Sequence, residues 1–268
     1  MQGVFATRRM HRIFGNDGRS LVVAMDHGSG LNVYPALTDA GHVIDDMVAG
    51  GADAILTTPG IAKQYPSDLR SVGLILRVDG GSSELSRGSM GYALLFTVED
   101  ALRLGADAVA CMGFPGTELE AQTLENLAKL AGQCRSWSVP LMAEMVPGGF
   151  MNSELHTVEN IRLAARIGVE LGADFIKTPF AGSAESFQQV TAHCYRPVLV
   201  LGGSKKDDDR ALFSMVKTAL SAGAAGVVIG RNIWCHPRPR AVVATLSQLI
   251  HHNTSVEEAL DTLASGSS

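Results

Sequence analysis

The sequence has few aromatic residues, few cysteines and little net charge, and it has no long hydrophobic run. Its 22 basic and 27 acidic side chains leave a formal net charge of −5 without a basic block, so no nucleic-acid partner is expected. The longest apolar runs are far shorter than the roughly 20 residues that cross a bilayer, so no membrane partner is expected. The four cysteines stand apart without a CxxC pair and the N-terminus lacks the apolar core of a signal peptide, which together indicate a cytoplasmic protein.

The hydrophobic residues, 46% of the chain, gather instead into short aliphatic runs. Most runs are apolar throughout rather than alternating, which is typical of strands covered on both faces. They span residues 20–25, 53–58, 72–78, 107–112, 139–145, 174–178, 197–203 and 226–231. Segments with helical periodicity separate several of them, namely 39–49, 97–104, 119–131, 157–171 and 208–222. This order predicts parallel strands joined by helical crossovers.

A repeated tripeptide, Gly-Ala-Asp, follows three of these helical segments, at residues 51–53, 105–107 and 172–174, and residues 223–226 carry a variant. Glycine suits the left-handed residue that ends a helix. Eight strands without a linker predict an α/β fold, a single (β/α)8 TIM barrel over residues 1–268. Residues 1–19 form its lead-in, 59–71 leave room for only a short helix, and 254–268 form a capped C-terminal helix with a frayed tail.

The active site of such a barrel lies at the carboxyl ends of its strands, so the polar residues that end the apolar runs are the candidates. Six ends carry them and should converge on one mouth. They are Asp26-His27-Gly28, Asp79-Gly80-Gly81, Glu144 with residues 146–149, Lys177, residues 202–205, and residues 230–232.

Lys177 stands in DFIKT, a strand that is otherwise apolar. Desolvation there favours the neutral amine, which can attack a carbonyl carbon and form an imine. An imine makes the neighbouring carbon acidic, which is how class I aldolases make or break a carbon–carbon bond. The alternative is that the Lys177 stem packs at the strand end and its head pairs with a surface acid.

Asp26, His27 and Glu144 are the other catalytic candidates. Asp26 is expected to pair with Lys177 and to act as acid or base on a substrate hydroxyl, unless Asp-His-Gly is simply a turn. His27 suits either a proton shuttle or a hydrogen-bonded structural residue. Glu144 lies inside an apolar run, where an unpaired charge is costly, so we expect it to pair with Lys177 or to relay protons.

The ends of the last two strands predict an anion site. Gly202 and Gly203 allow close approach to backbone N–H groups, and Arg231, which opens the last loop with Asn232, has a planar fork that matches phosphate oxygens. The alternative is that these glycines only permit tight turns. Lys205 is assigned to a solvated helix start rather than to the ligand site.

No metal site is expected, because the histidines are scattered. The chain also lacks a P-loop and a GxGxxG opening a helix after the first strand, so no nucleotide cofactor is expected, and it lacks the GxSxG elbow of a hydrolase. A divalent cation held by Asp26 and Glu144 is the less favoured alternative.

In order, the segments VVAMDHG, GAD, MVPGG, GADFIKT, LGGSK and GVVIGRN resemble the DeoC/FbaB/LacD superfamily over residues 20–255, in its branch of archaeal-type class I fructose-bisphosphate aldolases. This branch also contains heptulosonate synthases and the autoinducer-2 thiolase. The resemblance implies that Lys177 is the Schiff-base lysine and that Asp26 contacts both it and the substrate hydroxyl. It also implies that Gly203, Gly230 and Arg231 bind a substrate phosphate, and that the subunits form a homo-oligomeric ring.

The chain departs from the branch at MVPGG, where Val146 stands in place of a tyrosine that moves a proton in a YPRG-like motif. Valine cannot transfer a proton, so Glu144, Asp26 and His27 are candidates for that role. The arginine of the motif is also absent, which argues against a second phosphate on the substrate.

These observations predict a metal-independent class I aldolase that acts on a phosphorylated sugar or keto compound. The alternative within enzymes is acyl or ketol transfer, as in the thiolase-like and heptulosonate-forming relatives. From another class, a non-catalytic barrel that binds a phosphosugar is a further alternative.

Overall fold

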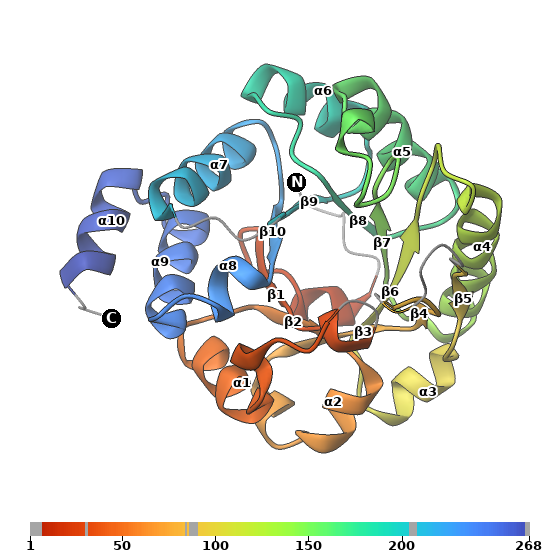
Figure 1. The fold of residues 1–268 in the computed structure, drawn as a ribbon, viewed down its shortest axis with the longest axis horizontal. Coiled ribbons are helices and arrows are strands. Elements are labelled where there is room, and N and C mark those ends of the chain that lie inside the picture. The colour runs from red at the N-terminus through yellow and green to blue at the C-terminus, as the bar shows by residue number, and fades with distance from the viewer. Residues whose placement is uncertain (1–6, 30–31, 84, 86–90, 204–207, 266–268) are drawn as a thin grey trace.

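The computed structural model describes residues 7–29, 32–83, 85, 91–203 and 208–265 (Figure 1). Lys205 therefore lies outside the described residues. Eight strands pair in parallel and close into a barrel in the order β1-β10-β9-β8-β7-β6-β3-β2, which confirms the predicted fold. They are β1 Ser20–Ala24, β2 Ala54–Thr57, β3 Gly73–Arg77, β6 Ala108–Gly113, β7 Leu141–Met145, β8 Phe175–Thr178, β9 Val198–Leu201 and β10 Gly226–Ile229.

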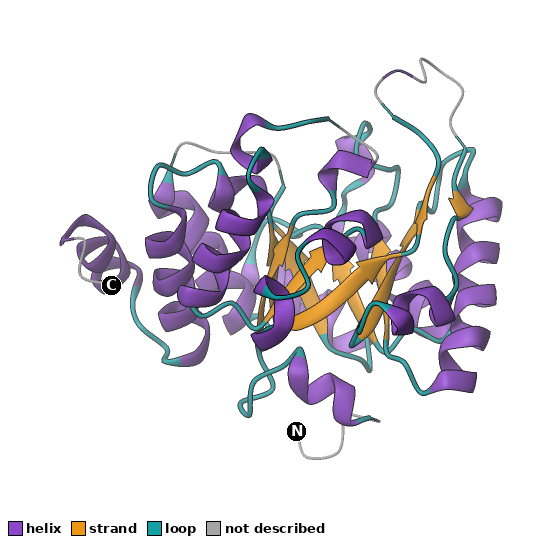
Figure 2. Cartoon of the chain, turned by 90° about the horizontal axis from the view of Figure 1, so that it is seen from below, coloured by secondary structure: helices purple, strands orange, loops and turns teal. Residues whose placement is uncertain are grey.

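Helices surround the strands on the outside of the ring (Figure 2). They are α1 Ala40–Ala49, α2 Pro59–Gln64, α3 Val98–Arg103, α4 Glu120–Trp137, α5 Val158–Glu170, α6 Ala184–His193, α7 Asp209–Ser221, α8 Arg231–Trp234, α9 Pro239–His251 and α10 Val256–Ser265. The predicted helical segments correspond to α1, α3, α4, α5 and α7, and α4 continues beyond its predicted end to Trp137. A short antiparallel ladder, β4 Asp79–Gly80 with β5 Ala93–Leu94, extends from the end of β3.

The strands are apolar throughout because both of their faces are covered. One set of side chains packs inside the ring, and the other set packs under the helices. A 3-10 helix, Arg8–Arg12, contributes Met10 to the inner set, and Phe14, just after it, meets Phe175 edge to face at 5.5 Å between ring centroids. The lead-in thus fills the amino-terminal end of the barrel and leaves the carboxyl end for chemistry.

The Gly-Ala-Asp repeat joins a helix end to a strand base. Its glycines Gly51, Gly105 and Gly172 have φ of 88°, 80° and 108°, the left-handed conformation that was predicted. Each aspartate accepts a hydrogen bond from a backbone N–H near the start of the barrel strand that comes before it in the chain. These bonds are Leu21 N–H to Asp53 (2.6 Å), Leu74 N–H to Asp107 (3.0 Å) and Leu141 N–H to Asp174 (2.9 Å). Each aspartate thereby clamps two neighbouring strands together.

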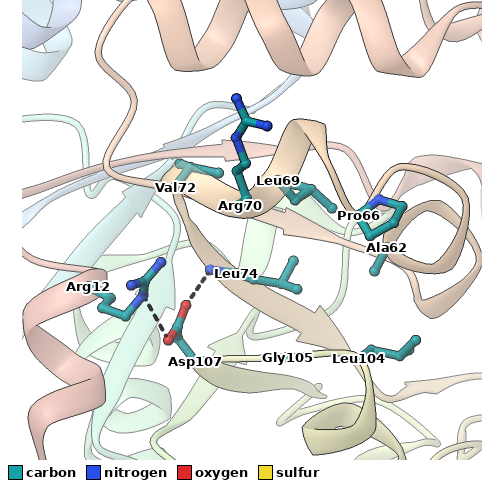
Figure 3. A pocket seen from close by; sticks show the side chains of 10 residues that line it. All are labelled: Arg12, Ala62, Pro66, Leu69, Arg70, Val72, Leu74, Leu104, Gly105 and Asp107. Carbon is teal, nitrogen blue, oxygen red and sulfur yellow. Dashed lines mark hydrogen bonds and ion pairs between the residues drawn. The ribbon is translucent and has the colours of Figure 1, made fainter.

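The clamp at Asp107 borders a pocket of about 370 Å³ at the amino-terminal end of the barrel, drawn in Figure 3. Arg12 Nε lies 3.1 Å from the second oxygen of Asp107, while Arg70 points away from this pair. The pocket is therefore at the opposite end of the strands from the predicted active site.

The clamp at Asp53 has an additional partner from the C-terminal part of the chain. His251 in α9 bridges two carboxylates, with Nδ1 2.9 Å from Asp17 and Nε2 3.0 Å from Asp53. The hydrogen bond to Asp53, helped by Asp17, raises the pKa of His251 above its ordinary value.

We expect His251→Gln to lower the free energy of unfolding by about 1.5–3 kcal/mol in acid solution, the range for hydrogen bonds to charged groups. Because the pKa of His251 in the folded state is raised above its ordinary value of 6.5, this stabilisation is fully present below pH 6.5. It is lost as the pH rises through the folded-state pKa. Urea unfolding at pH 6 and pH 9.5 measures the difference, with His42→Gln as a control in an exposed pair with Asp46. An equal loss at both pH values would contradict the bridge.

Candidate active site

Five charged side chains meet inside the carboxyl end of the barrel. Asp26 follows β1, Arg77 ends β3, Asp79 begins β4, Glu144 lies in β7 and Lys177 in β8. All have side chains at most 11% exposed. The strand register pairs Glu144 with Lys177, so their side chains leave adjacent strands toward the same face. The strand-end rule thus located the site.

Arg77 is the centre of the cluster. Its Nε donates to Asp26 Oδ2 at 2.9 Å, its Nη1 to Asp79 Oδ1 at 3.4 Å, and its Nη2 to Glu144 Oε2. Each nitrogen of the guanidinium therefore faces a different carboxylate. A second hydrogen bond, from Met112 N–H at 2.7 Å, fixes Asp79 behind Arg77.

Lys177 contacts the cluster through Glu144, with Nζ 2.7 Å from Oε1. This confirms the expected pairing of Glu144 with Lys177. The expected direct pair of Asp26 with Lys177 is wrong, because Arg77 takes the Asp26 carboxylate. Lys177 acts on Asp26 through space instead, as the pKa of Asp26 reflects.

The cluster holds three carboxylates and two cations in a buried space, so each pKa depends on its neighbours. Burial raises the pKa of Asp26, but the charges of Arg77 and Lys177 outweigh it and leave that pKa lowered. Burial also raises the pKa of Asp79, and there Arg77 offsets it only partly. Of the two carboxyl groups, Asp26 therefore stays ionised to lower pH, and Asp79 takes up a proton more readily.

His27 lies beside Asp26, with Nδ1 3.8 Å from Oδ1, and packs edge to face against Tyr34 and Trp234. Burial, with Lys177 and Arg231 nearby, lowers the pKa of His27 despite the Asp26 charge, so the ring is neutral at pH 7. Its buried Nδ1 has no hydrogen-bond partner among the described residues. A neutral imidazole with an unused nitrogen is able to accept a proton.

The four predicted phosphate residues lie together at the ends of β9 and β10. Arg231 Nη2 donates to Gly203 O at 3.3 Å, which ties the two ends to each other. Gly203 has a φ of 66° and open space where a Cβ would be, whereas a Cβ on Gly230 would come within 2.8 Å of His27. The buried Nε of Arg231 has no hydrogen-bond partner in the described part of the chain.

Arg77 was missed from the sequence, although it is the single charge in the run VGLILRV. Its position also bears on the alternative of a divalent cation between Asp26 and Glu144. The guanidinium fills the space between those two carboxylates. Among the described residues, no group of three His, Cys, Asp or Glu side chains is arranged to hold a metal ion.

A closed barrel with a buried lysine among carboxylates at its mouth is the arrangement of an aldolase that works through an imine. The chain belongs to the DeoC/LacD family of aldolases, whose family model matches residues 20–236. This confirms the predicted superfamily and the prediction of an aldolase that makes or breaks a carbon–carbon bond. No helix in the described ranges is both long and apolar enough to span a bilayer.

Similar proteins come from curated sequences and from solved structures. The chain is 37% identical over 254 residues to 2-amino-3,7-dideoxy-D-threo-hept-6-ulosonate synthase of Halobacterium salinarum, which covers 95% of this chain and 94% of the relative. A Schiff-base-forming fructose-1,6-bisphosphate aldolase superposes with a TM-score of 0.83 at 30% identity, over 91% of this chain and 98% of that one. An archaeal fructose-1,6-bisphosphate aldolase, whose catalytic lysine is bound to the carbinolamine intermediate of the substrate, superposes with a TM-score of 0.82 at 29% identity. The match covers 90% of this chain and 98% of that one.

Proposed function

We propose that the protein is a class I aldolase in which Lys177 forms an imine with the ketone of a phosphorylated sugar or keto compound. The observation that carries this proposal is the contact of Lys177 Nζ with Glu144 at 2.7 Å inside the barrel mouth. The similarity to a structure whose catalytic lysine is bound to a carbinolamine supports it. Cytoplasmic location and homo-oligomeric assembly stay predictions.

Glu144 and Asp26 have different parts in this proposal. Lys177 must lose a proton before it can attack a carbonyl carbon, and Glu144 Oε1 is the acceptor in contact with it. The attack forms a carbinolamine, and Glu144 returns the proton to the carbinolamine hydroxyl, which leaves as water. This gives the protonated imine and an ionised Glu144. Asp26, kept ionised by Arg77, then accepts a hydrogen bond from the substrate hydroxyl next to the bond that breaks.

Arg231 is proposed to bind the substrate phosphate with Gly202, Gly203 and Gly230. Its buried Nε without a partner marks a place where an anion can complete the hydrogen bonds. His27 lies between this place and the charged cluster, since both Arg231 and Asp26 act on its pKa. A substrate held by its phosphate at Arg231 would therefore extend past His27 toward Lys177.

Borohydride reduction with dihydroxyacetone phosphate, followed by peptide mass spectrometry, tests the proposal. We expect a stable adduct on Lys177, because the reduced imine cannot hydrolyse. Arg231→Met should raise the concentration for half-maximal trapping by about 10–100-fold, the range for a charge-assisted contact to phosphate.

Dihydroxyacetone without phosphate is the matched control, since Arg231→Met should leave its trapping unchanged. Lys177→Ala controls for reductive labelling of other lysines. Wild-type protein that forms no adduct on Lys177 with either ketone would overturn the imine, and an equal effect of Arg231→Met on both ketones would overturn the phosphate site.

A transferase that joins the imine-bound fragment to a second carbonyl compound is the second candidate. The 37% identity to a heptulosonate synthase favours it. Both candidates share the Lys177 adduct, so a screen of acceptor compounds with the trapped donor separates them.

A further inference from the structure

An enzyme that works through an imine needs a group that gives a proton to carbon. After the carbon–carbon bond breaks, the enamine carbon must be protonated before the product leaves. Glu144 and Asp26 are poor donors, because Arg77 binds both carboxylates and Lys177 binds Glu144 as well. The donor must hold its proton at neutral pH and face the mouth.

We propose that the Tyr92 hydroxyl is this proton donor, an inference that rests on the proposed function. Tyr92 comes directly before β5, which pairs with β4 just past the end of β3 and lies beside α4 (Figure 1). The ladder pairs Asp79 with Leu94 and Gly80 with Ala93, and Tyr92 is the next residue along β5's side of the ladder. The position of Tyr92 therefore depends on β4, the same short strand whose Asp79 accepts a hydrogen bond from Arg77.

Helix α4 fixes the backbone of Tyr92 from the outside. Gln122 accepts a hydrogen bond from Tyr92 N–H at 3.4 Å, and Asn126 Nδ2 donates to Tyr92 O at 3.0 Å. Both polar groups of the Tyr92 backbone therefore have partners on one helix, and the ring projects from a held backbone.

The ring of Tyr92 packs on the apolar cluster of Phe114, Leu119 and Val146, with its centroid 5.1 Å from that of Phe114. Val146 comes two residues after Glu144, just past the end of β7, and its N–H still bonds to Gly113 O at 2.9 Å. The alternation of the strand therefore places both side chains on the same side. The ring that packs on Val146 thus lies over the mouth next to the Glu144–Lys177 pair. Its hydroxyl forms no hydrogen bond to the described residues, so it is open to a substrate.

The electrostatic setting suits a proton donor. Burial raises the pKa of Tyr92 to about 12, so the phenol keeps its proton through the neutral range. Arg77 acts in the opposite direction and favours the phenolate. A phenolate formed by proton transfer would therefore be stabilised by a charge that is already in place.

The step is balanced within the site. The Tyr92 O–H bond breaks as a C–H bond forms at the enamine carbon, and the Lys177 nitrogen regains the positive charge of the protonated imine. The phenolate then takes a proton from the hydroxyl of the next substrate or from water. No oxidant, reductant or further reactant is needed.

Hydrogen exchange at carbon separates this role from imine formation. With dihydroxyacetone phosphate in D₂O, wild-type protein should exchange one hydrogen of the CH₂OH carbon, which NMR follows. Tyr92→Phe should slow this exchange about 100–10,000-fold, the usual contribution of a positioned acid or base, and leave borohydride trapping on Lys177 unchanged. Tyr195→Phe, on the outer surface against Arg166, is the matched control and should exchange like wild type.

A second variant keeps the ring and the hydroxyl. A polyfluorinated tyrosine at position 92 has a much lower phenol pKa. Because exchange begins when the phenolate removes a hydrogen from the imine carbon, the pH profile of exchange should move to lower pH, which a purely structural residue would not cause. Exchange at the wild-type rate in Tyr92→Phe, loss of trapping together with exchange, or an unmoved pH profile in the fluorinated protein would each overturn the role of Tyr92. Absence of the adduct in wild-type protein would instead overturn the proposed function, and this inference with it.

Discussion

Turnover should fall by at least about 10⁴-fold when Lys177 is replaced by methionine, because Lys177 is the buried amine of the cluster that the described residues form at the mouth. Methionine keeps much of the length of the lysine stem and loses the nitrogen. Glu144 keeps its contact with Arg77 in this variant, so its carboxylate is not left unpartnered. We therefore expect a folded protein that is inactive, as measured by carbon–carbon bond cleavage and circular dichroism on the same sample.

Lys177→Arg is the matched control for charge. It supplies Glu144 with a cation and still cannot form an imine, so it should be as inactive as Lys177→Met. Residual turnover within about tenfold of wild type in either variant would show that the reaction does not pass through Lys177.

Arg77→Met should lower the free energy of unfolding by about 3–5 kcal/mol, the cost of breaking a buried ion pair from one side. The substitution removes the cation that contacts Asp26, Asp79 and Glu144, and of these three only Glu144 has an ion pair with Lys177 among the described residues. Urea unfolding at neutral pH measures the loss. Activity should fall with it, because both Asp26 and Glu144 take their orientation from Arg77.

The pH dependence distinguishes a loss of charge balance from a loss of packing. The pKa of Asp79 is already raised by burial, and it rises further without Arg77. A raised folded-state pKa means that the folded state binds the extra proton, so the variant should regain stability as the pH falls through that pKa. Arg103→Met, which breaks an exposed pair with Asp100, should cost less than about 1 kcal/mol and show no such recovery. An equal cost for both variants would refute the central role of Arg77.

The sequence was informative where a local pattern has one structural outcome. Runs apolar on both faces predicted the buried parallel strands, and left-handed glycines such as Gly51 predicted the helix ends. The strand-end rule then predicted that Lys177, Glu144 and Asp26 lie near one another, because parallel strands in a barrel all finish at the same edge, and the three side chains do meet around Arg77.

Side-chain partners could not be read in the same way. Whether Asp26 reaches Lys177 or Arg77 depends on how deep each side chain lies and on the register of strands 51 residues apart in the chain. Arg77 in VGLILRV gives a signal, since a lone charge in a buried run needs partners, but it does not identify them. Tyr92 gives no local signal, because its place over the mouth depends on α4 and on Val146 of another strand.

The three Gly-Ala-Asp clamps, together with the variant at residues 223–226, group the eight barrel strands into four neighbouring pairs. Each aspartate bonds to the preceding strand through both its side chain and its own N–H, across 32 or 33 residues. Ala225 holds the same place in the last pair, where its N–H donates to Val198 O at 2.8 Å. The barrel is thus built from four βαβ modules in tandem, and closing one module costs less chain entropy than closing the whole ring. The modules resemble one another at the amino-terminal end of the barrel, where these bonds lie. They differ from one another at the carboxyl end, where the charged side chains meet.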